Sequence, residues 1–188
     1  MIPTDRFDDA LVYASRLHRN QRRKGTGIPY VAHLLAVAAL VIEHGGDEDQ
    51  AIAALLHDAA EDQGGAATLA EIEARFGPAV AGIVADCTDS WCEPKPPWRA
   101  RKQAYLEKLA AKPEASQLVS LADKTHNARA ILADRRQVGE AIWDRFTGGR
   151  DGTLWYYRSL AHCFGTVLPG PLTDELQRTV AALASEPG

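Results

Sequence analysis

The side chains best suited to chemistry in this sequence are His33, the adjacent pair His57 and Asp58, and Asp123. Each lies in a segment with a helical pattern, and successive residues of a helix point about 100° apart. Both side chains of a His-Asp doublet can therefore contact one ligand only if that ligand is packed against the helix that carries them. A divalent cation held between helices is the natural candidate, because imidazoles and carboxylates together suit Mn²⁺, Fe²⁺ or Zn²⁺. These residues predict a metal-dependent hydrolase.

Two further carboxylates follow the doublet. Glu61 and Asp62 lie one turn after it, in what we expect to be a single helix over residues 47–62. Burying several carboxylates together is costly unless a cation neutralises them, which supports a metal at this place. A doublet alone carries little weight, and a single histidine on an apolar helix, such as His33, is more often a hydrogen-bonded core residue.

The composition limits the class of protein. The 188 residues predict one domain with a substantial core, and the net charge of −4 argues against general binding to DNA or RNA. Basic residues are concentrated at 16–24 and 95–102, which fits a small polyanionic ligand, although solvated helix ends explain any one of them better. The cysteines lack metal-ligand spacing, no signal peptide opens the chain, and no apolar stretch approaches the roughly 18 residues of a membrane span. We expect a cytoplasmic protein without a membrane partner, monomeric or homodimeric.

Hydrophobic periodicity predicts helices along nearly the whole chain, and no β-strand alternation persists. Asp47 and Gln50 form a predicted capping box, and residues 90–97, with three prolines, indicate a surface loop. The stretch 135–153 is less regular. The predicted class is an all-α single domain of about eight to ten helices. The expected helices cover residues 4–17, 30–44, 47–62, 68–76, 98–111, 115–133, 154–164 and 173–185, with another that starts at Pro78.

Four sequence blocks occur in order, and the metal-type residues fall inside them. They are HRNQRRKGTGIPYVAH at 18–33, ALLHDAAEDQ at 54–63, FGPAVAGIVADCTD at 76–89 and SLADKTHNAR at 120–129. Together they resemble the HD-domain hydrolases of the RelA/SpoT type, which remove the 3′-pyrophosphate from the guanosine alarmones (p)ppGpp. The resemblance is strongest over residues 5–135 and implies a small stand-alone alarmone hydrolase. Residues 136–188 are expected to form a helical extension packed on the same domain.

The resemblance also implies roles for individual residues. Glu61 and Asp62 match the acidic pair that orients the attacking water and handles protons, but which of the two is acid and which is base stays open. In the nucleotide pocket a guanidinium could stack on the base and an ammonium group could meet phosphate. The metal ligands, normally of Mn²⁺, match His33, His57, Asp58 and Asp123. The nucleotide-binding residues match Arg23, Lys24 and Asn127, with Arg129 expected nearby.

The chain departs from the family at several places. Gln63 stands where a threonine commonly follows the acidic pair, and Ala130 replaces a hydroxyl residue. The regions 90–99 and 143–158 also differ from the best-known members. These departures leave the metal ligands intact but weaken the assignment of the substrate.

Aromatic residues in the C-terminal part allow two interpretations. Aromatic side chains at helical spacing usually belong to the core, and we expect this for Trp143 and Trp155. Tyr156 or Tyr157 could instead reach the pocket and bind a phosphate or ribose group.

Three functional hypotheses follow. The leading one is a metal-dependent hydrolase that converts (p)ppGpp into GDP or GTP and pyrophosphate. The second is an HD phosphatase for another small nucleotide, such as a nucleoside monophosphate or the 2′-phosphate of NADPH. The third is a non-catalytic helical nucleotide-binding module. The clustered ligand-type residues argue against the third, because a disused site has no physical reason to keep neighbouring carboxylates.

Overall fold

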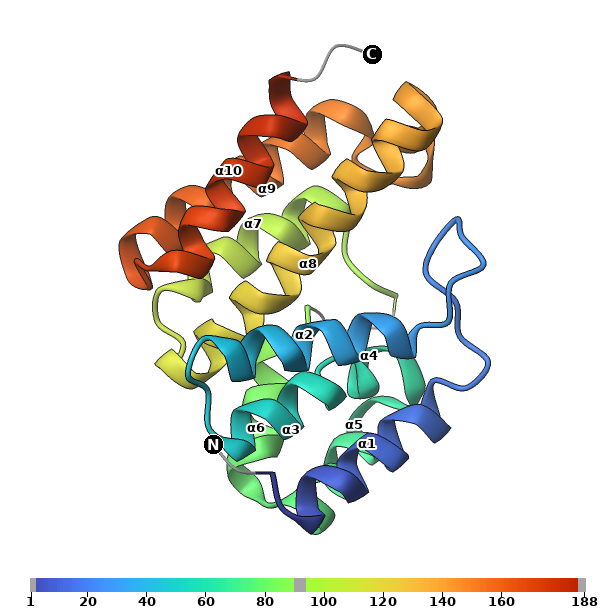
Figure 1. The fold of residues 1–188 in the computed structure, drawn as a ribbon, viewed down its shortest axis with the longest axis vertical. Helices are drawn as coiled ribbons and strands as arrows, with labels where there is room; N and C mark the ends of the chain where they lie inside the picture. The colour runs from blue at the N-terminus through green and yellow to red at the C-terminus, as the bar shows by residue number, and fades with distance from the viewer. Residues whose placement is uncertain (1–2, 90–93, 186–188) are drawn as a thin grey trace. The chain divides into compact units, whose positions relative to one another are not determined.

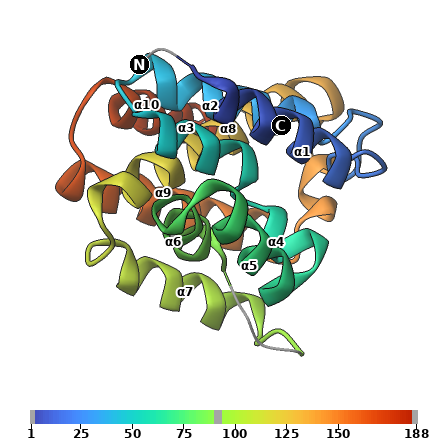
Figure 2. The same ribbon diagram turned by 90° about the horizontal axis from the view of Figure 1, so that it is seen from below.

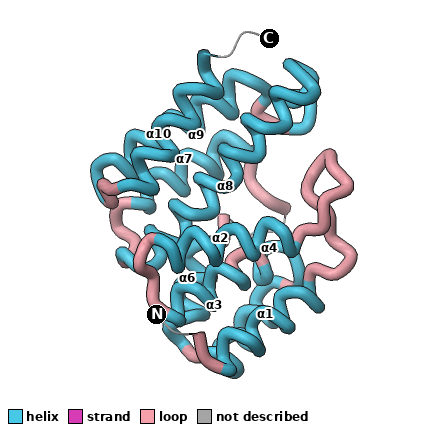
Figure 3. The backbone as a smooth tube through the Cα atoms, viewed as in Figure 1, coloured by secondary structure: helices cyan, strands magenta, loops and turns pink. Residues whose placement is uncertain are grey.

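The computed structural model describes residues 3–89 and 94–185, and most of these are helical (Figures 1 and 3). Among them, extended backbone pairs at one isolated antiparallel bridge, between Arg22 and Pro29. The all-α prediction is therefore confirmed. The chain divides into two compact units, Met1–Lys95 with Pro113–Ala122, and Pro96–Lys112 with Asp123–Gly188. In the described part of the chain, no helix is both long enough and apolar enough to cross a membrane.

The first unit is built around helix α3 (Glu48–Leu56), which is apolar from Ala51 onward. The other helices of this unit are α1 (Asp5–Leu17), α2 (Val31–Glu43), α4 (Ala59–Gln63), α5 (Gly65–Phe76), α6 (Pro78–Cys87) and the start of α8 (Glu114–Val138). All residues from Ala51 to Leu56 are buried, so only the first turn of α3 reaches solvent. Helices α1, α2 and α6 pack on it, and α5 lies beside α6, both green in Figure 2. This packing fixes the C-terminal end of α3 inside the unit.

Local sequence signals set several helix ends of the first unit. The Thr4 hydroxyl accepts a hydrogen bond from the backbone amide of Arg6 at the start of α1. Asp47 and Gln50 form the predicted capping box at the start of α3. Pro78 occupies the first turn of α6, where its missing amide hydrogen costs nothing.

The predicted single helix over 47–62 is wrong. Helix α3 ends at Leu56, the chain turns at His57 and Asp58, and α4 begins at Ala59. Asp58 has φ −99° and ψ −2°, which is the sparsely populated bridge region where many active-site residues lie. Its carboxylate is engaged by the hydroxyl group of Tyr30, a tertiary contact that helical periodicity does not encode.

The start of α5 also differs from the prediction. We expected this helix to begin at Thr68, but α5 begins at Gly65 and Thr68 lies within its first turns. The Thr68 hydroxyl donates to the carbonyl oxygen of Gln63 at 3.0 Å, so it links α5 back to α4. Gly65 has φ +65°, and a glycine adopts this conformation without strain where the chain turns from one helix into the next.

The second unit contains three complete helices, a 3₁₀ helix and the end of α8. The complete elements are α7 (Trp98–Leu109), the 3₁₀ helix η1 (Gly139–Arg145), α9 (Gly149–Val167) and α10 (Pro171–Ser185). Helix α9 packs against α7, η1 and α10, and Figure 1 shows α9 and α10 side by side. Leu160 and Phe164 of α9 and Leu176 of α10 are fully buried in this packing.

A buried guanidinium group links three elements of the second unit. Arg135, in α8, is 4% exposed and donates to the Glu140 carboxylate at 2.9 Å and to the Leu183 carbonyl oxygen at 2.8 Å. Its guanidinium carbon lies 5.7 Å from the centre of the Trp143 ring. Because Glu140 belongs to η1 and Leu183 to α10, one side chain ties both elements to α8.

The C-terminal aromatic residues mostly belong to the core. Trp143 is buried as predicted, whereas Trp155 is half-buried with the guanidinium carbon of Arg99 3.1 Å from its ring centre. Tyr156 and Tyr157 are both buried in the second unit.

The stretch 135–153 is more helical than its sequence indicates. Helix α8 continues to Val138, η1 follows, and α9 begins at Gly149. A Cβ atom at Gly148 would lie 2.7 Å from the Trp98 ring, so glycine here permits close packing rather than marking a loop. Of the predicted loop 90–97, residues 94–97 are non-helical and residues 90–93 lie outside the described residues.

Candidate metal centre

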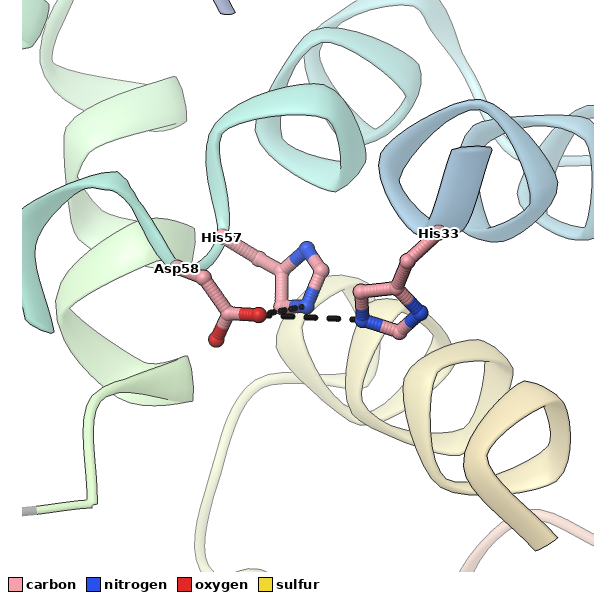
Figure 4. Close-up of side chains that lie close together, drawn as sticks. All are labelled: His33, His57 and Asp58. Carbon is pink, nitrogen blue, oxygen red and sulfur yellow. Dashed lines mark ion pairs between the residues drawn. The ribbon is translucent and has the colours of Figure 1, made fainter. Parts of the chain in front are cut away.

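Three of the predicted ligands meet in the first unit. The ligand atoms of His33, His57 and Asp58 all lie within 4.8 Å of one another. Asp58 Oδ2 is 3.0 Å from His57 Nε2 and 3.6 Å from His33 Nε2 (Figure 4). The side chains of both histidines are 1% exposed and that of Asp58 is 22% exposed. The cluster is therefore buried on the histidine side and reached from solvent at Asp58.

The turn after α3 explains how adjacent residues can share one point. His33 comes from the first turn of α2, and His57 follows the last residue of the buried α3. On a continuous helix, Asp58 would point about 100° away from His57. With the turn at this position, the Asp58 carboxylate faces both imidazole rings, which lie edge to face with their centres 5.1 Å apart.

Hydrogen bonds around the cluster prepare it for a cation. The Nδ1 atom of His57 lies 2.8 Å from the carbonyl oxygen of Ala54, and a carbonyl can only accept, so Nδ1 carries the hydrogen. The other ring nitrogen of His57, Nε2, faces Asp58 and is the one left to bind a cation. The Tyr30 hydroxyl donates to Asp58 Oδ2 at 2.5 Å. Two imidazole nitrogens and an oriented carboxylate fit a divalent cation such as Mn²⁺, Fe²⁺ or Zn²⁺.

The acidic pair on α4 occupies two different environments. Glu61 accepts from the Lys95 ammonium group at 2.7 Å and from the backbone amide of Asp89 at 3.0 Å. Asp62 instead accepts from the Gln21 side-chain amide at 2.8 Å. Although part of Asp62 is exposed, partial burial of its carboxyl group raises its pKa, and the charge of Asp58 raises that pKa further. Glu61 is thus held by the Lys95 ammonium group, and Asp62 takes up a proton more readily than an ordinary aspartate.

The predicted basic pair lies on the segment between α1 and α2. The guanidinium carbon of Arg23 is 6.0 Å from the ring centre of Tyr30, and Arg23 is half-buried. Lys24 is exposed next to it. Both residues belong to the same unit as the histidine cluster, and their contact with a nucleotide stays a prediction.

The remaining predicted residues belong to the second unit. The Asp123 carboxylate accepts from the Lys124 ammonium group at 2.6 Å and from the Asn127 side-chain amide, so Asp123 and Asn127 share a helix face as expected. Burial disfavours the charge of Lys124, but Asp123 and two tyrosines hold its pKa well above the usual value. Arg129 is paired with Glu175 of α10. The roles of Asp123 as fourth ligand and of Asn127, Arg129, Tyr156 and Tyr157 in substrate binding stay predictions.

Several residues of the first unit contact the predicted site residues although the sequence did not predict these contacts. Tyr30 contacts Asp58, Gln21 contacts Asp62, and Lys95 contacts Glu61. Tyr30 and Gln21 lie inside the block 18–33, which is a signal that the whole block serves the site. Nothing in the sequence pairs Lys95 with Glu61, because 34 residues separate them.

Comparison with known proteins adds independent information. A model of the HD domain family matches residues 10–154 of this chain. The guanosine-3′,5′-bis(diphosphate) 3′-pyrophosphohydrolase MESH1 of Homo sapiens is 39% identical over 126 residues, 65% of this chain and 68% of that protein. MESH1 of Drosophila melanogaster is 37% identical over 132 residues, 69% of this chain and 71% of that protein. The bifunctional (p)ppGpp synthase/hydrolase SpoT of Escherichia coli is 33% identical over 166 residues, 85% of this chain but only 22% of that protein.

Solved structures show the same similarity. One, described as "A metazoan ortholog of SpoT hydrolyzes ppGpp and plays a role in starvation responses", has a TM-score of 0.77 and 26% identity, and the match covers 96% of this chain and 97% of that one. Another, of lmo0812 from Listeria monocytogenes, has a TM-score of 0.73 and 29% identity, with 82% of this chain and 99% of that one covered.

Proposed function

Because this chain belongs to the HD domain family, we propose that it is a metal-dependent hydrolase that removes the 3′-pyrophosphate of (p)ppGpp. The observation that carries the proposal is the convergence of His33, His57 and Asp58, with all their ligand atoms within 4.8 Å. The names of the MESH1 relatives support this substrate, and the basic residues on the segment after α1 supply charge suited to a polyphosphate. The expected products are GDP or GTP and pyrophosphate.

In this proposal the metal is Mn²⁺, with Fe²⁺ and Zn²⁺ as alternatives. His33, His57 and Asp58 hold it, and Asp123 is the proposed fourth ligand. When bound, the cation supplies Lewis acidity, polarising a phosphoryl oxygen and lowering the pKa of a coordinated water. The His57 tautomer set by the Ala54 carbonyl supports this role.

The acidic pair divides the work of proton transfer and orientation. Asp62, whose pKa is raised, accepts a proton from water as the water oxygen attacks the phosphorus bonded to the 3′-oxygen. The bond between that phosphorus and the 3′-oxygen breaks, the leaving 3′-oxygen takes a proton from solvent water, and Asp62 then releases the proton that it accepted back to solvent. Glu61, held by Lys95 and the Asp89 amide, orients the water. This division rests on the different partners of the two carboxylates.

Substrate residues complete the proposal. Arg23 stacks on the guanine base or meets phosphate, and Lys24 neutralises phosphate charge. Asn127 and Arg129, with Tyr156 or Tyr157, contact the nucleotide.

A product assay tests this function. Purified protein with Mn²⁺ is offered ppGpp, NADPH and GMP separately, and pyrophosphate and orthophosphate are both measured. We expect GDP and pyrophosphate from ppGpp, and no release of either phosphate by the His57→Ala variant. Orthophosphate from NADPH or GMP, without pyrophosphate from ppGpp, would instead establish a phosphatase. Nucleotide binding without any turnover by the metal-loaded protein would establish a binding module.

A further inference from the structure

We propose that Gln21 is a positioning residue that holds the Asp62 carboxylate in its reactive orientation, and that His18 and Gln63 set the direction of the Gln21 amide. The inference rests on the proposed function, in which Asp62 accepts a proton. It concerns residues of the first unit, and none of them is a metal ligand.

Four side chains form one continuous hydrogen-bonded network. The Nε2 atom of Gln21 donates to Asp62 Oδ2 at 2.8 Å. The Oε1 atom of Gln21 lies 2.7 Å from Nδ1 of His18 and 2.6 Å from Nε2 of Gln63. Both polar atoms of the Gln21 amide therefore have short, defined partners.

The chemistry of the partners fixes the direction of every bond in this network. A carboxylate only accepts hydrogen bonds, so the nitrogen of the Gln21 amide must face Asp62. The oxygen of that amide then faces His18 and Gln63, both of which must donate to it. His18 is 1% exposed, and this burial lowers its pKa, so the ring is neutral with its hydrogen on Nδ1. Rotating the amide by half a turn would set an oxygen against Asp62 and an NH₂ group against two donors.

The backbone holds Gln21 as firmly as its side-chain partners do. The Gln21 amide hydrogen bonds to the carbonyl oxygen of His18 at 3.0 Å, and the Gln21 carbonyl accepts from the amide of Tyr30 at 3.0 Å. The next residue, Arg22, forms the isolated bridge with Pro29. Because two backbone hydrogen bonds fix the main chain at Gln21, its side chain can hold Asp62 in place.

Asp62 needs such a fixed partner. It lies on α4, which has only five residues, and part of it is exposed. The negative charges of Asp58 and Glu61 both act on its carboxyl group. Without a donor in a fixed place, these charges would turn the side chain toward solvent. The Gln21 amide supplies that donor from outside the helix.

Gln63 adds a second donor to the oxygen of the Gln21 amide. A glutamine follows the acidic pair here, and its side-chain amide reaches Gln21 directly. Gln63 is the last residue of α4, directly after Asp62, so the same short helix carries both the carboxylate and a group that orients the carboxylate's partner. Its influence on Asp62 therefore passes through Gln21.

The first test replaces the amide by a group of similar shape that has no hydrogen-bond donor. For Gln21→Met we expect kcat for pyrophosphate release from ppGpp to fall roughly 10- to 100-fold, as for loss of one hydrogen bond to a charged group, while KM changes less than about 3-fold. Bound Mn²⁺ and the thermal midpoint should match those of the wild type. Gln103→Met is the matched control, because Gln103 donates to the Glu107 carboxylate on an exposed helix face.

A double-mutant cycle tests the direction of action. Gln63→Met should lower kcat by less than Gln21→Met, and Gln21→Met with Gln63→Met should equal Gln21→Met alone, because Gln63 acts only through Gln21. Additive effects, or an unchanged kcat in Gln21→Met, would overturn the proposal. So would a rise in KM or a loss of metal that accounts for the whole change. If the wild-type protein released no pyrophosphate, the proposed function itself would be wrong. The wild-type assay therefore tests the function, and the variants test the role of Gln21.

Discussion

The hydroxyl group of Tyr30 donates to Asp58 Oδ2 at 2.5 Å, and that same oxygen lies 3.0 Å from His57 Nε2. Tyr30 comes from the segment just before α2, and Asp58 from the turn after α3. The contact therefore fixes the Asp58 carboxylate, which completes the cluster. Tyr30 itself is not one of the predicted metal ligands. Outer partners of this kind orient ligands and tune metal affinity.

Removing the Tyr30 hydroxyl should weaken metal binding without unfolding the protein. We expect Tyr30→Phe to raise the Kd for Mn²⁺ by roughly 10- to 100-fold, as for other outer partners of metal ligands. Titration calorimetry with Mn²⁺ measures the change. Tyr13→Phe is a matched control, because Tyr13 is a buried tyrosine of α1 that packs beside Phe76. An unchanged Kd in Tyr30→Phe would show that Asp58 is oriented by other contacts.

Removing one imidazole should abolish both metal binding and turnover. His57→Ala is expected to lose bound metal and at least about 100-fold of its activity, more than loss of an outer partner costs. Elemental analysis of the purified variant and pyrophosphate release from ppGpp are the two measurements. His162→Ala is the control, since His162 is exposed on α9. Metal retained at the wild-type level in His57→Ala would contradict the assignment of this cluster.

The buried His18 ring should make stability depend on pH. Burial lowers the pKa of His18 in the folded protein, while the unfolded chain binds the proton near pH 6.5. Below that pH the unfolded state carries the extra proton, so the free energy of unfolding should fall as the pH falls, by at most about 1.4 kcal/mol per pH unit. Above pH 6.5 this contribution is fully present.

Urea unfolding at pH 8.0, 6.5 and 5.5, with a chelator present, checks this expectation. The difference in unfolding free energy between the wild type and His18→Gln removes the contribution of groups common to both. As the pH falls, the wild type should lose more unfolding free energy than the His18→Gln variant. If it were constant across the three pH values, His18 would titrate alike in the folded and unfolded states.

Truncating the buried Arg135 side chain should destabilise the second unit. Arg135→Ala leaves the Leu183 carbonyl oxygen without this donor and removes the link to Glu140, so we expect a loss of about 3 kcal/mol in the free energy of unfolding. Urea unfolding followed by tryptophan fluorescence reports on it, because Trp143 lies beside the guanidinium group. Arg178→Ala, at an exposed position of α10, should change the stability by less than about 0.5 kcal/mol.

Much of the architecture follows from local patterns. Apolar spacing predicts most helices of the first unit, and the caps at Thr4, Asp47 and Pro78 place their starts. The prediction of helix ends from glycine residues is where local patterns fail. Gly65 and Gly149 look like helix stops, yet each begins a helix, because a positive φ lets the chain change direction between closely packed helices.

The residue types and their order within the four blocks already determine the candidate ligands and the acidic pair. What periodicity cannot supply is the point at which faces of different helices meet. Tyr30 and Asp58 are 28 residues apart, and Gln21 and Asp62 are 41 apart, so no local rule relates them. Only the packing of the helices of the first unit, with the turn at His57 and Asp58, brings these atoms within hydrogen-bonding distance. Local propensity acts over a few residues, whereas a site is assembled from contacts that exist only once the core has closed.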